Sequence, residues 1–78
     1  MTHDAHLTLT GHAPTDLRII ISHMHTTGHL TTRQHDAIIL RINGLTWHTI
    51  ALTLGTTIRS ARTHHDRALQ RVLDHMTA

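Results

Sequence analysis

The stretch LTWHTIALTLGTTIRSARTHHDRAL, residues 45–69, constrains the fold more than any other part of the chain. It holds two segments with helically spaced apolar residues, and only residues 55–57 (GTT) separate them. A tight turn of about three to four residues that contains Gly is typical of a helix-turn-helix. The small Ala51 lies four residues before Gly55 and allows two helices to approach closely. The stretch therefore predicts two packed helices.

The second of these helices is amphipathic. On a helical wheel with about 100° per residue, the residues within about 60° of His65 are Ile58, Ala61, Ala68, Leu69, Val72 and Met76. The opposite side carries Ser60, Thr63, Arg67, Gln70 and Asp74. Arg59 and Arg62 lie between these two sides. Because arginine matches guanine edges and hydroxyls bind phosphate oxygens, the N-terminal half of this helix has side chains suited to DNA.

Helical periodicity extends through most of the chain. We expect helices over about residues 15–27, 32–43, 47–54 and 57–76. Glycines stand where each of the first three segments stops, and threonines precede the last three. The prediction is an all-α fold: a small four-helix domain over residues 13–78 with a C-terminal helix-turn-helix, preceded by a flexible N-terminal arm over residues 1–12.

Size and charge point to a small domain with a basic C-terminal side. A chain of 78 residues buries only about 60 % of its unfolded surface, so a partner or self-association would add stability. The formal net charge is +2, and all fixed charges are Arg or Asp. Residues 56–78 carry four arginines and two aspartates, which makes this segment the expected electrostatic face.

Several function classes find no support. No apolar run approaches the roughly 18–20 residues of a membrane span, and the N-terminus lacks the pattern of a signal peptide. We therefore expect a soluble, cytoplasmic protein with no membrane partner. Lys, Glu and Cys are absent, and there is no paired-carboxylate constellation or glycine-rich phosphate loop, so we expect neither an enzyme nor a cofactor.

Eleven histidines raise the question of a metal site. His23 and His25 are two residues apart and point to different faces of a helix, and His64 and His65 diverge similarly. His25 and His29 have suitable spacing, but a glycine ends the helix between them. We expect no structural or catalytic metal.

A set of residues matches a known pattern in one register without a gap. They are Leu30, Thr31, Arg33, Ala37, Ile38, Leu40, Gly44, Leu45, Thr46, Ile50, Ala51, Leu54, Gly55, Thr57, Arg62, Thr63, His64, Arg67, Ala68 and Leu69. Residues 30–69 thereby resemble the helix-turn-helix of LuxR-type response regulators and of sigma factor region 4. A preceding helix, with none after the long one, is more similar to sigma region 4.

The chain departs from that family pattern at five positions. Gln34 and Thr49 replace two glutamates, Thr56 replaces the apolar residue after the glycine, Ala61 replaces Val, and His65 replaces Leu. The last three departures reduce the volume of the core.

The resemblance and the wheel together place a DNA-binding surface on this chain. Base-edge contacts are expected from Arg59, Ser60, Arg62, Thr63 and His64. Backbone contacts are expected from Arg67 and, at the start of the preceding helix, from Thr46 and Trp47, while Thr57 begins the recognition helix. An alternative for Arg62 is a pair with Asp66, four residues on.

The resemblance implies sequence-specific binding of double-stranded DNA by a transcriptional regulator. One recognition helix reads only a few base pairs, so we expect a homodimer, formed through Ile19 or through the C-terminal end near Leu73 and Met76. The alternative is a protein-binding helix-turn-helix that docks on RNA polymerase or on a sigma or anti-sigma partner. Such a protein would tolerate the loss of Arg59 and Arg62.

Two single residues carry further expectations. The chain has one Trp and no Phe or Tyr, and the ring of this Trp47 is expected to pack near Leu45 and Ile50. His65 lies in the middle of an apolar stripe, which indicates a hydrogen-bonded core histidine or a histidine at a dimer contact.

Overall fold

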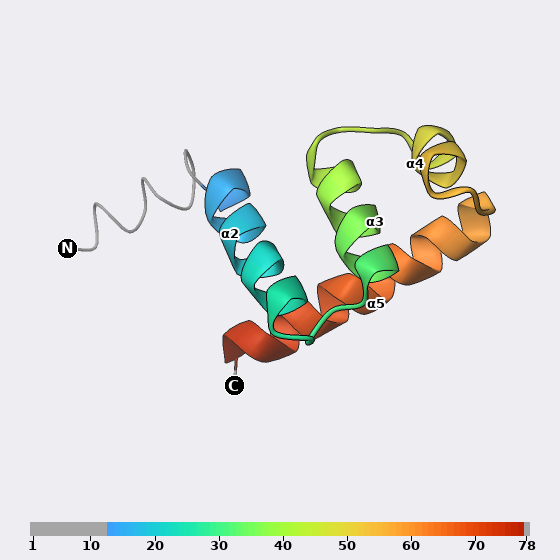
Figure 1. The fold of residues 1–78 in the computed structure, drawn as a ribbon. Helices are drawn as coiled ribbons and strands as arrows, with labels where there is room; N and C mark the ends of the chain where they lie inside the picture. Colours follow the sequence, from blue (N-terminus) through green and yellow to red (C-terminus); the bar gives the residue numbers. More distant parts are fainter. Residues whose placement is uncertain (1–12, 78) are drawn as a thin grey trace.

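The computed structural model describes residues 13–77, which form four helices over this range (Figure 1). They are α2 (Ala13–Thr26), α3 (Thr32–Ile42), α4 (Trp47–Leu54) and α5 (Ile58–Thr77). The all-α prediction is confirmed, and each helix begins and ends within two residues of its expected bounds. The arm expected over residues 1–12 lies outside the described residues. None of the described helices is both long and apolar enough to cross a membrane.

Glycine determines where α4 ends. Gly55 has φ +65°, a left-handed conformation that glycine adopts at little cost. The N–H of Thr56 then donates to the carbonyl of Ala51 at 2.9 Å, five residues back, which is the hydrogen bond of a Schellman cap. The same arrangement ends α3, where Gly44 has φ +90°. These caps satisfy the last carbonyls of each helix within very short connections.

Threonine determines where α3, α4 and α5 begin. Thr31 caps α3 and forms a reciprocal capping box with Gln34, whose side chain accepts from the Thr31 N–H at 3.1 Å. Gln34 therefore supplies the reciprocal hydrogen bond of a capping box. Thr46 caps α4, and the hydroxyl of Thr57 accepts from the N–H of Ser60 at 3.0 Å in the first turn of α5.

The long helix α5 supports the other three. Figure 1 shows α2 and α3 side by side against its C-terminal part, with α4 across its N-terminal part. One cluster of buried residues joins α2, α3 and α5 and comprises Ile21, Met24, Leu30, Ile38, Ala68 and Val72. A second cluster lies in the helix-turn-helix and comprises Ile50, Ala51 and Ala61. Both clusters depend on α5, so its orientation is set along most of its length.

The apolar stripe of α5 is buried along one edge only. Its small members Ala61, Ala68 and Val72 are buried, whereas Ile58 and Leu69 are more than two-fifths exposed. The side chains that approach α3 and α4 most closely are therefore the small ones. The larger residues on the other edge of the stripe remain on the surface.

Candidate nucleic-acid interface

The helix-turn-helix is assembled around two alanines. Ala51 of α4 and Ala61 of α5 are both buried in the cluster with Ile50. Small side chains at this contact let the two helix backbones approach closely, which fixes the direction in which α5 leaves the turn. A hydrogen bond also links α3 to this unit, because the guanidinium of Arg33 donates to the carbonyl of Leu54 at the end of α4.

Most of the expected DNA-contacting side chains lie on the surface. Six are exposed: Thr46, Thr57, Arg59, Arg62, Thr63 and Arg67. Three are only partly accessible: Trp47, Ser60 and His64. Seven of the nine lie between residues 57 and 67, within the first half of α5 and the cap that precedes it. The other two mark the start of α4.

Trp47 packs on the second cluster and carries charged groups on its ring. Like Leu45, it packs against the cluster that contains Ile50, as expected. The guanidinium carbon of Arg41 lies 4.5 Å from the ring centroid, and that of Arg62 lies 5.5 Å from it. Both distances are within the roughly 6 Å range of a cation–π interaction.

Arg62 is therefore not paired with Asp66. That carboxylate instead accepts a hydrogen bond from Nδ1 of His65 at 3.1 Å. The His65 side chain is only 17 % exposed, and its ring meets the Trp47 ring edge-on with centroids 5.0 Å apart. Of the two roles expected for His65, this matches a hydrogen-bonded histidine that is largely buried. The helical wheel does not indicate its aromatic neighbour.

Arg41 belongs to this surface although the sequence reasoning did not include it. It lies in the last turn of α3, outside the helix-turn-helix, and its Nη1 donates to the carbonyl of Leu45 at 2.9 Å. The turn at Gly44 brings Arg41 back toward the beginning of α4. The sequence signal that could have found it is the Schellman turn itself, because such a turn brings residues on its two sides together.

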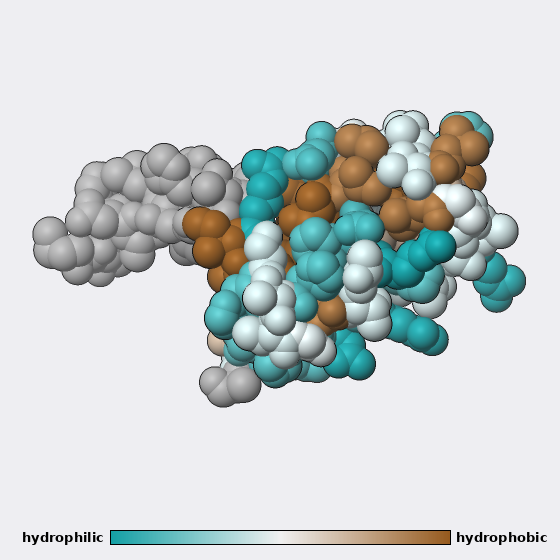
Figure 2. All heavy atoms as spheres, in the orientation of Figure 1, coloured by the Kyte–Doolittle hydropathy of each residue, from teal (hydrophilic) through white to brown (hydrophobic). Residues whose placement is uncertain are grey.

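Within residues 17–77, no aspartate pairs with an arginine of the interface. Among the side chains of residues 17–77, the only close contacts between a basic group and a carboxylate are those of His35 with Asp36 and of His65 with Asp66. Within the same residues, Arg59 and Arg67 have no hydrogen-bond acceptor. Figure 2 shows hydrophilic side chains along the edge where α5 runs, while apolar ones gather over α2, α3 and α4.

The histidines form pairs. His25 of α2 stacks on His35 of α3 with ring centroids 4.4 Å apart, and the rings of His29 and His75 are 5.9 Å apart. Among the side chains of residues 17–77, no three from histidine or aspartate come close enough together to hold a metal ion.

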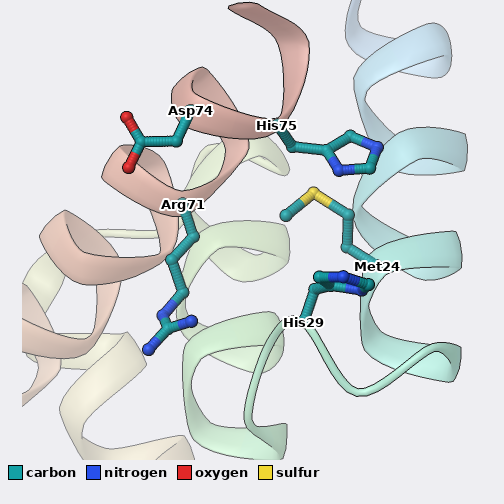
Figure 3. A pocket seen from close by; sticks show the side chains of 5 residues that line it. All are labelled: Met24, His29, Arg71, Asp74 and His75. Atoms are coloured by element: carbon teal, nitrogen blue, oxygen red, sulfur yellow. The ribbon is translucent and has the colours of Figure 1, made fainter. Parts of the chain in front are cut away.

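A shallow pocket of about 340 Å³ lies at the other end of α5. Met24, His29 and His75 lie close together between the end of α2 and the last turns of α5 (Figure 3). Arg71 and Asp74 complete its lining. Because these α5 residues follow the helix-turn-helix, the pocket is separate from the surface formed by residues 57–67.

Comparison with known proteins gives one match. The family model described as "Sigma-70, region 4" matches residues 24–72, which is more than half of the chain and includes α3, α4 and most of α5. No curated protein and no solved structure matches the chain.

Proposed function

Because the chain belongs to the sigma-70 region 4 family of helix-turn-helix, DNA-binding, transcription-related domains, we propose that it binds double-stranded DNA sequence-specifically and acts as a cytoplasmic transcriptional regulator. The observation that carries this proposal is the cluster of exposed Arg59, Arg62 and Arg67 on the first half of α5. These arginines are unpaired with any aspartate among residues 17–77.

In this proposal, the first half of α5 enters the major groove. Arg59, Ser60 and Thr63 face the base edges, where an arginine fork recognises guanine and hydroxyls accept or donate to any base. Thr46 and Arg67 contact phosphates on either side. His64 is half-buried, so its contribution is smaller than that of the exposed side chains.

A homodimer completes the proposal. A single helix reads only a few base pairs, and a net charge of +2 gives little non-specific hold on phosphate. On the C-terminal half of α5, Leu69, Leu73 and Met76 are exposed by 42 %, 48 % and 55 % and share one side of the helix at spacings of four and three. We place the dimer contact there, because among the side chains of residues 17–77 Ile19 is the only exposed large apolar residue of α2, at 64 %.

A titration of fluorescein-labelled, random-sequence duplex DNA tests the proposal. Fluorescence anisotropy should report micromolar binding at low salt, and the affinity should fall at least about tenfold between about 50 mM and 200 mM salt, as phosphate contacts release counterions. No binding at low salt, or binding that salt does not weaken, contradicts DNA binding. Recruitment of RNA polymerase that survives loss of both Arg59 and Arg62 would instead support the protein-docking alternative.

A further inference from the structure

The Trp47 ring holds two arginines from different helices. Arg41 comes from the last turn of α3 and Arg62 from the second turn of α5, and their guanidinium carbons lie over the ring at 4.5 and 5.5 Å from its centroid. Both arginines are exposed, whereas the ring itself is partly buried against the second cluster. The tryptophan is thus a fixed platform with two charged groups at its surface.

The ring is itself held in place. Its inner side packs on the cluster that contains Ile50, and His65 meets it edge-on with centroids 5.0 Å apart. A guanidinium that lies on an aromatic face keeps the N–H donors of its rim free to bind an anion. Arg41 is restrained a second time, because Nη1 donates to the Leu45 carbonyl at 2.9 Å. The two arginines therefore lose little conformational freedom on binding a ligand.

The charges of this pair are available to an external anion. The nearest aspartate in sequence to Arg62 is Asp66, and its carboxylate is bonded to His65. Neither Arg41 nor Arg62 forms an ion pair with an aspartate among residues 17–77. Two guanidinium groups held on one ring, together with the exposed Thr46 residue whose hydroxyl caps α4, fit a polyanionic backbone better than a single small anion.

We propose that Trp47 is a positioning residue that presents Arg41 and Arg62 together to the phosphate backbone, so that Arg41 is a DNA contact from outside the helix-turn-helix. This inference rests on the proposed DNA binding and specifies which groups hold the backbone. It shifts Arg62 from a base-reading role to a phosphate-binding one, and leaves Arg59 as the principal arginine for base edges.

The first test is the salt dependence of binding to random-sequence duplex. Arg41→Ala should weaken binding about fivefold at low salt and reduce the slope of log affinity against log salt by about one, as the loss of one phosphate contact requires. Arg71→Ala, an exposed arginine beside the pocket at the other end of α5, is the matched control and should leave affinity within about twofold.

The second test separates positioning from folding. Trp47→Phe keeps an aromatic face and should bind DNA within about threefold of the parent, whereas Trp47→Leu keeps an apolar side chain and should lose about fivefold. Circular dichroism at the binding temperature confirms that both variants are folded. Arg41→Ala should cost clearly less affinity in the Trp47→Leu background than in the parent, because the residues are coupled.

The outcomes distinguish this inference from the function on which it rests. If the parent protein binds no duplex, the proposed function fails. If the parent binds but Arg41→Ala changes neither affinity nor salt slope, the paired-arginine surface is wrong while DNA binding stands. Equal binding by the Trp47→Phe and Trp47→Leu variants, or additive effects of Trp47→Leu and Arg41→Ala, also overturns the positioning role.

Discussion

The guanidinium carbon of Arg62 lies 5.5 Å from the centroid of the Trp47 ring, which links the second turn of α5 to the first residue of α4. The two residues are separated by the whole of α4 and the turn that follows it. Their contact, together with the packing of the buried Ala51 and Ala61, joins both the start and the middle of α4 to the first half of α5. The orientation of the recognition helix is therefore supported by side chains as well as by the turn.

Arg59 should carry sequence discrimination. It is exposed near the start of α5 and has no acceptor among residues 17–77. On an operator selected from a random pool, Arg59→Ala should cost about 1–3 kcal/mol of binding free energy, whereas on random duplex the loss should be much smaller. Anisotropy titrations on both duplexes measure this. Equal losses on the two duplexes would make Arg59 a phosphate contact.

Gly55→Ala should destabilise the fold through the backbone alone. Gly55 has φ +65°, and an added Cβ would meet no atom within 4 Å, so only the left-handed conformation opposes the substitution. The expected loss is about 1–2 kcal/mol of unfolding free energy, measured by urea denaturation. Gly55→Asn should lose less, because asparagine tolerates this region. An alanine variant as stable as the parent would show that the turn has another conformation in solution.

Ala61→Leu should disrupt the contact between α4 and α5. Ala61 is fully buried in the helix-turn-helix, so a larger side chain must push the two helices apart. We expect a loss of about 1–3 kcal/mol in unfolding free energy and, in addition, weaker DNA binding by the fraction that remains folded. Gln70→Leu, at an exposed position on the same helix, is the control and should change stability little. A fully stable Ala61→Leu variant would mean that the helices are not closely packed.

Charges placed on the C-terminal half of α5 should prevent dimer formation. Leu73 and Met76 are about half exposed, and replacing both with Asp puts two like charges into each copy's contact surface. Sedimentation velocity should show a concentration-dependent dimer for the parent and a monomer for the Leu73→Asp/Met76→Asp variant. Ile19→Asp is the control on α2. A variant that dimerises like the parent would exclude this surface.

Much of the local structure could be predicted because it depends on local chemistry. Gly44 and Gly55 end helices through their left-handed conformation, and Thr31 and Thr46 begin the next ones through their hydroxyls. The expected positions of helix ends rest on these residues, which act within one turn of where they stand.

The contacts that could not be predicted are tertiary. A helical wheel treats α5 alone, so it placed Ile58 inside the apolar stripe; in the folded chain α3 and α4 cover the edge with Ala61 and Ala68 instead. The same limit applies to Arg41, whose proximity to Trp47 depends on how the chain reverses at Gly44. Which edge of the apolar stripe of α5 is buried depends on the volumes of the side chains that α3 and α4 pack against it.

An amide-resolved NMR titration of the ¹⁵N-labelled protein with random-sequence duplex at low salt tests the central claim most directly. If the first half of α5 enters the groove, the largest shift changes should fall on the amides of residues 57–67 and 46–47. The indole N–H signal of Trp47 should also shift when Arg41 binds phosphate. Shift changes in the last two turns of α5, where the proposed dimer contact lies, would report dimer formation, and α2 should change little. Largest changes on α2 or around Met24 and His75, with residues 57–67 unaffected, would contradict the assignment of this surface to DNA.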